Sequence, residues 1–147
     1  MTKLSIRKIE SPPDKRVYER IRVLLSELYP KNAPIAFDRY KEVIQLDQSQ
    51  VYTAFIDDKI VGMASIVCYD KLGGKVCVIE DVIVDKASRG QGVGKALTLK
   101  LLEVAQDFGA AFIDVNTRRA EAKEFYKRIG FQEKDKERPF FSLRYYL

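Results

Sequence analysis

The sequence predicts an α+β fold with a mixed sheet, about seven strands and about four helices. Three observations lead to this class: a meander of strand-like runs, apolar stripes at helical spacing, and one strand–helix–strand unit behind a glycine-rich turn. The chain has 147 residues, of which 46% are hydrophobic and 32% charged. That is enough apolar material for one core, so we expect a single domain over residues 1–147.

The first half of the chain predicts one strand and two helices. Residues 4–9 alternate between apolar and polar side chains, which is typical of a strand. An apolar stripe at helical spacing over residues 17–28 stops before Pro30, and a shorter stripe over residues 37–44 indicates a second helix.

Three strands follow as an antiparallel meander. Residues 51–56 and 60–67 flank the turn at 57–59, and residues 75–84 follow a turn around Gly73 and Gly74. Short polar or glycine-rich turns between such runs are typical of hairpins.

The pattern then changes to a crossover unit. Residues 93–108 keep helical spacing up to Gly109, and residues 111–115 are a short apolar run. The strands before and after this helix should be parallel with a right-handed connection. A last helix over 120–129 ends at Gly130, and residues 131–134 and 140–147 predict two final strands.

The composition excludes several kinds of site. There is no histidine, which removes Ser-His-Asp and Cys-His triads, histidine-ligated zinc, and an imidazole proton shuttle. The only cysteines, Cys68 and Cys77, are too few for a disulfide framework or a thiolate metal site. Their strand context allows a cross-strand pair but favours two reduced, buried side chains. We therefore expect no metal.

The apolar segments and the net charge of the chain indicate where the protein is found and which kinds of ligand suit it. Charged residues interrupt every long apolar stretch, and the amino-terminal residues lack the apolar segment of a signal peptide. We therefore expect a cytoplasmic protein that neither spans nor binds a membrane. The net charge of +5 suits nucleic acid, an acidic surface or a polyanionic small molecule. Tyr145 and Tyr146 beside Arg144 could stack on bases, but an aromatic edge strand on the core or at a homodimer contact is favoured.

The segment from 82 to 97 contains the strongest candidate for a ligand-binding site. It predicts a strand, a loop with Gly90, Gly92 and Gly94, and the start of a helix. Glycines let the backbone approach a ligand, and the free N–H groups of a first helical turn attract anions. Arg89 and Lys95 add positive charge. Three glycines exceed what a tight turn alone needs, so the loop predicts a phosphate site.

Spacing separates the known phosphate loops. A Walker A loop fails because Arg89 stands at its first glycine and Ala96 at its serine or threonine. A dinucleotide fingerprint lacks its last glycine, although Asp114 imitates the ribose-binding acid. Asp114 makes the dinucleotide pattern the runner-up. The argument against it is that the chain is too short to hold both a dinucleotide-binding domain and a substrate domain.

A third pattern fits without a gap. Residues 89–94, Arg-Gly-Gln-Gly-Val-Gly, resemble the Arg/Gln-x-x-Gly-x-Gly/Ala signature of the GNAT superfamily of N-acetyltransferases. Residues 116–126 and the pair at 130–131 resemble the second cofactor segment of that family, 22 residues after Gly94. The order of the predicted elements is also similar, so the resemblance covers nearly the whole chain and implies a GNAT-like sheet.

The resemblance implies acetyl-CoA as acyl donor and no metal. Its pyrophosphate would lie on backbone N–H groups of the glycine loop, and its pantetheine arm would pair with the end of the preceding strand. Arg119 stands where many relatives have asparagine. The implied cofactor-binding residues are Val82, Ile83, Val84, Arg89, Gly90, Gln91, Gly92, Val93, Gly94, Lys95, Asn116, Arg119 and Tyr126.

The implied catalytic residues are Tyr126, Glu80 and Asp81. Tyr126 stands at the position of the usual general acid, and a phenol suits a departing thiolate, although its ring could instead cover the edge of the core. Glu80 and Asp81 are neighbours on opposite strand faces, so one should face the ligand groove as a base. Pairing with surface lysine or arginine is the alternative.

These expectations favour transfer of an acetyl group from acetyl-CoA to a primary amine of a small molecule, peptide or protein. A CoA-binding regulatory domain without turnover is the alternative, and a dinucleotide or nucleic-acid binder is more remote. The acceptor would be selected by residues 17–50, whose composition shows no recognisable pocket.

Overall fold

A computed structural model describes residues 3–10, 14–134, 137 and 141–147. The chain divides into two compact units, Met1–Asn116 and Thr117–Leu147. The first contains β1 (Leu4–Lys8), α1 (Lys15–Leu28), α2 (Phe37–Ile44), β2 (Ser49–Ile56), β3 (Lys59–Lys71), β4 (Gly74–Val84), the 3-10 turn η1 (Lys86–Ser88), α3 (Val93–Phe108) and β5 (Ile113–Val115). The second contains α4 (Ala120–Ile129).

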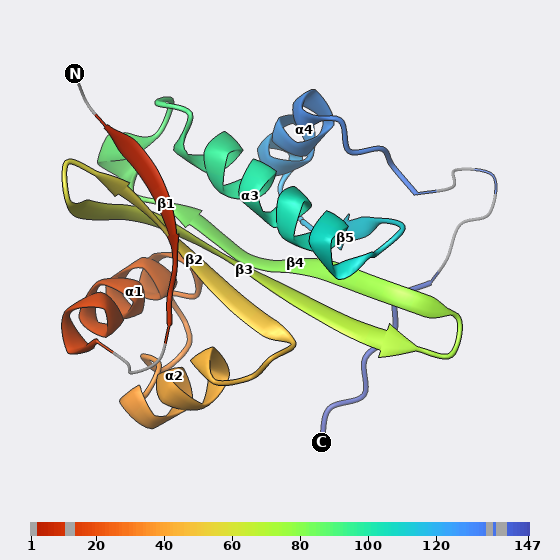
Figure 1. Cartoon of the computed structure of the whole chain (residues 1–147), viewed down its shortest axis with the longest axis horizontal. Coiled ribbons are helices and arrows are strands. Elements are labelled where there is room, and N and C mark those ends of the chain that lie inside the picture. Colours follow the sequence, from red (N-terminus) through yellow and green to blue (C-terminus); the bar gives the residue numbers. More distant parts are fainter. Residues whose placement is uncertain (1–2, 11–13, 135–136, 138–140) are drawn as a thin grey trace. The chain divides into compact units, whose positions relative to one another are not determined.

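The five strands form one mixed sheet in the order β1-β2-β3-β4-β5 (Figure 1). The first four strands are antiparallel, and β5 pairs parallel to β4 across the α3 crossover. Asp57 and Asp58 join β2 to β3 with φ angles of 45° and 66°, which match the twist of a tight hairpin. The predicted α+β class with a mixed sheet is confirmed.

Helices cover both faces of this sheet. Met63 of β3 belongs to a buried cluster with Ile21 and Leu24 of α1, whereas the neighbouring Gly62 faces Val93 and Leu97 of α3. Successive residues of a strand point to opposite faces. The helices α1 and α2 therefore lie on one face of the sheet and α3 on the other (Figure 1).

The expectation of about seven strands is wrong, because the sheet of the described residues has five. Residues 131–134 form no strand, and Phe131 instead closes the end of α4. The N–H of Phe131 donates to the carbonyl of Tyr126 over 3.1 Å, and the two rings pack at 5.3 Å between centroids. This hydrogen bond and apolar contact are typical of a helix C-terminus.

The other expected strand, 140–147, is also missing from the sheet. Phe140 lies outside the described residues, and residues 141–147 form no regular element. Their apolar side chains are exposed, as at Phe141, Leu143 and Tyr146. Alternation alone does not make a strand, because a strand also needs backbone hydrogen bonds to a neighbour.

The cysteines correct a second expectation. Cys68 and Cys77 form a disulfide between β3 and β4, so they are not two reduced side chains. They are direct register partners with 4.2 Å between their Cα atoms. Cys68 donates its N–H away from β4, to Gln48, which places the two cysteines at a non-hydrogen-bonded pair, where facing side chains are closest.

Within the described residues, no helix is long and apolar enough to span a membrane. The same part of the chain holds no group of three or more potential metal ligands.

Candidate functional site

The glycine-rich turn lies between β4 and α3. After β4 ends at Val84, the chain makes η1 and reaches Val93, the first residue of α3. Gly90 and Gly92 have φ angles of 77° and 79°, a left-handed conformation that favours glycine. Both glycines are therefore needed for the backbone path, and open space surrounds the position that a Cβ atom would take at each.

The start of α3 presents free N–H groups. No side chain caps the helix at Gly92, and the first backbone bond runs from the N–H of Ala96 to the carbonyl of Gly92 over 2.9 Å. The N–H groups of residues 93–95 thus have no partner within the described chain. Such a helix end binds anions.

Polar side chains stabilise the turn from within. Arg89 Nε donates to the carbonyl of Val84 over 3.1 Å, and Gln91 Nε2 donates to the carbonyl of Ala87 over 3.4 Å. Arg89 therefore helps to hold the loop in addition to its expected charge. Lys95 is exposed on the first turn of α3.

The end of β4 has an open edge. The pairing of β4 with β5 covers Cys77 to Ile79 and stops there. Val82, Ile83 and Val84 pair only with β3 among the described residues. Apart from the carbonyl of Val84, which accepts from Arg89 Nε, their groups on the β5 side have no hydrogen-bond partner in the described part of the chain and can pair with an added strand or an extended ligand.

A β-bulge precedes this open edge. Ala64 pairs with Val82 and Ile66 pairs with Ile79, so Ser65 alone lies opposite both Glu80 and Asp81. The N–H of Asp81 donates to Ser65 Oγ over 3.1 Å. Strict alternation, which would place the two acids on opposite faces, is interrupted at this position.

The two acids have different surroundings. The hydroxyl of Tyr29, just beyond α1, donates to the carboxylate of Asp81. This hydrogen bond, with desolvation and the two nearby negative charges, raises the pKa of Tyr29 to about 12. Partial burial and the charge of Asp81 raise the pKa of Glu80 above its ordinary value. Glu80 is therefore a stronger proton acceptor than an isolated glutamate.

A cavity of about 170 Å³ opens beside Asp81. Its walls come from α1 and from the segment between α1 and α2, and they are lined by Arg22, Leu25, Ser26, Tyr29, Asn32, Ala33, Pro34, Ile35 and Asp81. The composition of residues 17–50 had shown no pocket, because these residues are brought together only when α1 packs on the sheet.

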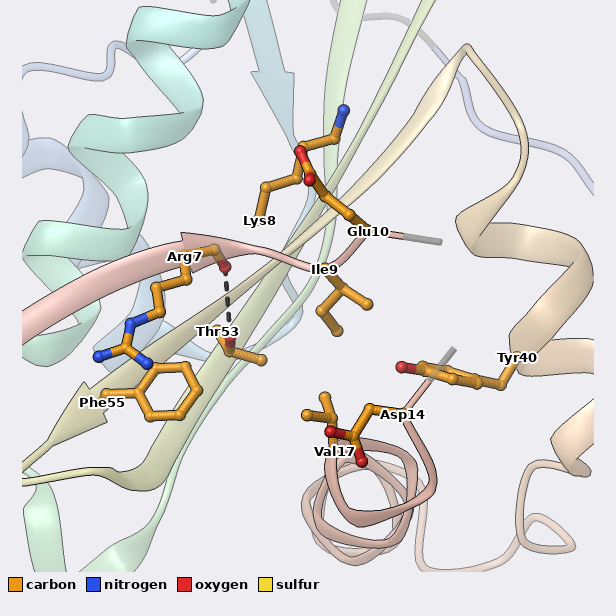
Figure 2. A pocket seen from close by; sticks show the side chains of 9 residues that line it. All are labelled: Arg7, Lys8, Ile9, Glu10, Asp14, Val17, Tyr40, Thr53 and Phe55. Atoms are coloured by element: carbon orange, nitrogen blue, oxygen red, sulfur yellow. Dashed lines mark hydrogen bonds between the residues drawn. The ribbon is translucent and has the colours of Figure 1, made fainter. Parts of the chain in front are cut away.

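A second cavity, of about 160 Å³, lies beside Tyr40 (Figure 2). The Tyr40 hydroxyl is buried without a hydrogen-bond partner in the described chain. In Figure 2, Lys8 and Glu10 point away from this hydroxyl, and Arg7 lies against the ring of Phe55. Val17 and Tyr40 come from the range 17–50 that was expected to select the acceptor, but none of the expected catalytic or cofactor-binding residues lines this cavity.

The second unit holds Tyr126 and Arg119. Tyr126 is buried, with the rings of Phe125 and Phe131 at 5.0 and 5.3 Å between centroids. Burial raises the pKa of Tyr126, so its phenol keeps its proton at neutral pH. Arg119 is exposed at the start of α4, with its Nε 3.9 Å from Glu121, and Asn116 is exposed directly after β5.

A family model described as the acetyltransferase (GNAT) family matches residues 18–131, which include both cofactor motifs. The chain belongs to the GNAT acetyltransferase family. The resemblance seen in the sequence is thereby confirmed.

Curated relatives of this GNAT chain are N-acetyltransferases. It is 31% identical over 103 residues to the uncharacterized N-acetyltransferase MJ1207 of Methanocaldococcus jannaschii, covering 65% of this chain and 45% of that protein. It is 35% identical over 82 residues to the glucosamine 6-phosphate N-acetyltransferase of Trypanosoma brucei brucei, covering 54% and 55%. The chain thus spans about half the length of these relatives.

Solved structures share the fold. An aminoglycoside acetyltransferase, meta-AAC0020 from an uncultured soil metagenomic sample, superposes with a TM-score of 0.80 at 20% identity, covering 96% of this chain and 97% of that one. The aminoglycoside N-acetyltransferase AAC(6')-Iy, solved in complex with CoA, has a TM-score of 0.77 at 22% identity, covering 98% and 96%.

The sequence did not single out Tyr29 or Ser65. Tyr29 lies 52 positions from its partner Asp81, and Ser65 lies 16 positions from the same residue. A tyrosine before Pro30 and a serine in a strand carry no local signal of either contact.

Proposed function

We propose that this GNAT chain transfers an acetyl group from acetyl-CoA to a primary amine of a small molecule. The observation that carries the proposal is the open edge of β4, which leads directly into a turn with unpartnered helix N–H groups. An extended amide chain that ends in a pyrophosphate would match both parts in this order.

The donor would be held mainly by backbone groups. The pyrophosphate would accept from N–H groups of the segment 90–95, aided by the charge of Lys95 and the helix dipole. The amides of the pantetheine arm would pair with Val82 to Val84 as an added strand. Side chains of Arg89 and Gln91 would support the turn through their bonds to Val84 and Ala87.

The acceptor would occupy the cavity beside Asp81. The carboxylate attracts an ammonium group, and Ser26 and Asn32 can hydrogen-bond to hydroxyl groups of the same molecule. A volume of about 170 Å³ suits a compact amine. The glucosamine 6-phosphate N-acetyltransferases among the relatives favour a hydroxylated amine of the amino-sugar type over a peptide.

The two acids would divide the work at the amine. Asp81 already accepts a hydrogen bond from Tyr29, which fits a group that anchors the acceptor. Glu80 has no such bond in the described chain and has a raised pKa, so it would take the proton as the amine nitrogen attacks the thioester carbon. As the carbon–sulfur bond breaks, Tyr126 would donate its proton to the thiolate.

The test combines binding with turnover. We expect acetyl-CoA to bind in calorimetry, and thiol release to require an amine such as glucosamine 6-phosphate, in a panel with an aminoglycoside and a lysine peptide. Lys95→Glu should weaken acetyl-CoA binding, whereas Lys59→Glu, an equal charge change at the exposed start of β3, should not.

Each outcome has a meaning. Binding without thiol release for any amine would indicate a regulatory CoA-binding domain. Thiol release with the lysine peptide alone would indicate that the acceptor is an amine of a protein and not of a small molecule. Absence of acetyl-CoA binding would refute the proposal.

A further inference from the structure

Arg20 makes a two-point contact from α1 to the sheet. Its Nε donates to the carbonyl of Ile60 in β3 over 2.9 Å, and its Nη2 donates to Asp85 Oδ2 over 2.5 Å. The side chains of Arg20 and Asp85 are only 32% and 29% exposed. A half-buried fork that satisfies a carbonyl and a carboxylate together fixes geometry better than an exposed ion pair.

Asp85 is the first residue after β4 and begins the path to the glycines. Its N–H donates to the carbonyl of Val61 over 2.8 Å, which extends the β3 contact. Its Oδ1 accepts from the N–H of Ala87 over 3.3 Å, and its carbonyl accepts from the N–H of Ser88 over 2.9 Å. Asp85 therefore sets the direction of η1 and of the turn that follows.

The carboxylate of Asp85 also carries a charge of the wrong sign for an anion site. It stands four residues before Arg89 and five before Gly90. Without Arg20, an unpaired half-buried carboxylate would lie at the base of the loop expected to bind a pyrophosphate. Pairing with a guanidinium cancels this charge at short range.

We propose that Arg20 is a positioning residue for acetyl-CoA. It holds Asp85, and through Asp85 the segment 85–92, in the conformation that presents the N–H groups to the pyrophosphate. This inference rests on the proposed function, because it assigns a role toward the same donor. The contact of Arg20 with Asp85 also connects α1, which forms a wall of the acceptor cavity, to the donor turn.

The main test is Arg20→Met, which keeps the length of the side chain and removes the fork. The control is Arg16→Met, the same change on the exposed surface of the same helix. We expect the Kd and KM for acetyl-CoA to rise about tenfold or more in Arg20→Met, and kcat and the acceptor KM to change less than about threefold.

A truncated donor separates positioning from general damage. S-Acetyl-pantetheine lacks the pyrophosphate, so its kcat/KM should fall less than about threefold in Arg20→Met, while that of acetyl-CoA falls about tenfold. An equal loss with both donors would show a structural role and refute the inference.

Asp85→Asn tests the other partner. It keeps an oxygen for the N–H of Ala87 but removes the charge that faces Arg20. Removal of this negative charge favours an anion, but Asp85 is then held less firmly by Arg20, so we expect a smaller loss of acetyl-CoA binding than in Arg20→Met. A combined variant with Arg20→Met should lose less than the product of the two single losses, because the pair acts as a unit. If Arg20→Met does not fold by circular dichroism, Arg20→Lys and Asp85→Asn carry the same comparison.

The failures are distinguishable. If the wild type binds acetyl-CoA and Arg20→Met binds it as tightly as Arg16→Met does, the role of Arg20 is refuted and the proposed function stands. If the wild type does not bind acetyl-CoA, the proposed function fails and this inference fails with it.

Discussion

Gly62 of β3 is the position where one added methyl group should disturb the packing beneath the donor turn. An ideal Cβ atom there would lie 3.0 Å from the carbonyl oxygen of Ile83, 3.2 Å from Val93 Cγ1 and 3.3 Å from Leu97 Cδ1. The first contact is with strand backbone, and the other two are with the first turns of α3. The missing side chain thus allows α3 to lie close to the sheet.

The expected cost follows from two opposing effects. Overpacking a core position costs about 1–3 kcal/mol, because neighbouring groups must move by a few tenths of an ångström. Replacing glycine by alanine also removes freedom from the unfolded chain, which stabilises by about 0.4–1 kcal/mol. Gly62→Ala should therefore lower the free energy of unfolding by roughly 1–2 kcal/mol, or Tm by roughly 2–8 °C for a chain of this size.

The matched control is Gly73→Ala in the turn between β3 and β4. Its Cβ atom would meet nothing closer than Lys71 Cε at 3.9 Å, and its φ is outside the left-handed region. It should be as stable as the wild type or slightly more stable. Urea unfolding followed by circular dichroism measures both variants. Equal stability of the two would contradict the close approach of α3 to β3.

Three further predictions concern the chemistry. Tyr126→Phe should lower kcat by about 10² to 10⁴ with little change in acetyl-CoA affinity, because the hydroxyl acts only as the thiolate leaves; full activity would leave Tyr126 as a packing partner of Phe125. A base must be unprotonated, so the wild-type rate should rise with pH through the raised pKa of Glu80. Glu80→Gln should abolish that limb, with a loss that shrinks at high pH; an unchanged pH profile would assign the base elsewhere. The double variant Cys68→Ser and Cys77→Ser should keep its turnover within about twofold but lose about 2–3 kcal/mol of stability, as closure of a short loop suggests. Loss of turnover in a folded double variant would give the cysteines a chemical role.

Elements with strong periodicity could be predicted from the sequence. The stripe over 93–108 matches α3, and the helix expected over 120–129 matches α4. Both end at glycines, Gly109 and Gly130, whose N–H groups bond back to the last turn. These signals are local, because a helix makes its hydrogen bonds within its own segment.

The carboxyl-terminal strands could not be decided in this way. The alternating residues after Phe140 have the pattern of a strand, but whether they pair depends on a neighbour that the pattern does not specify. The disulfide posed the same difficulty. Cys68 and Cys77 were expected on adjacent strands, yet only the register places them directly opposite each other.

In the candidate site too, the sequence predicted local features and missed contacts between distant residues. The glycine turn was found because all of its parts lie within a few residues of one another. The contacts that Arg20 of α1 and the following Tyr29 make with the sheet could not be found in this way. Arg20 lies 40 positions from Ile60 and 65 from Asp85, and Tyr29 lies 52 from Asp81. The apolar stripe of α1 identified the face that packs on the core, whereas Arg20 and Tyr29 lie off that stripe. Their partners depend on the sheet register and on the bulge at Glu80 and Asp81. A residue that acts on the donor or the acceptor from α1 therefore becomes visible only when the helix is placed on the sheet.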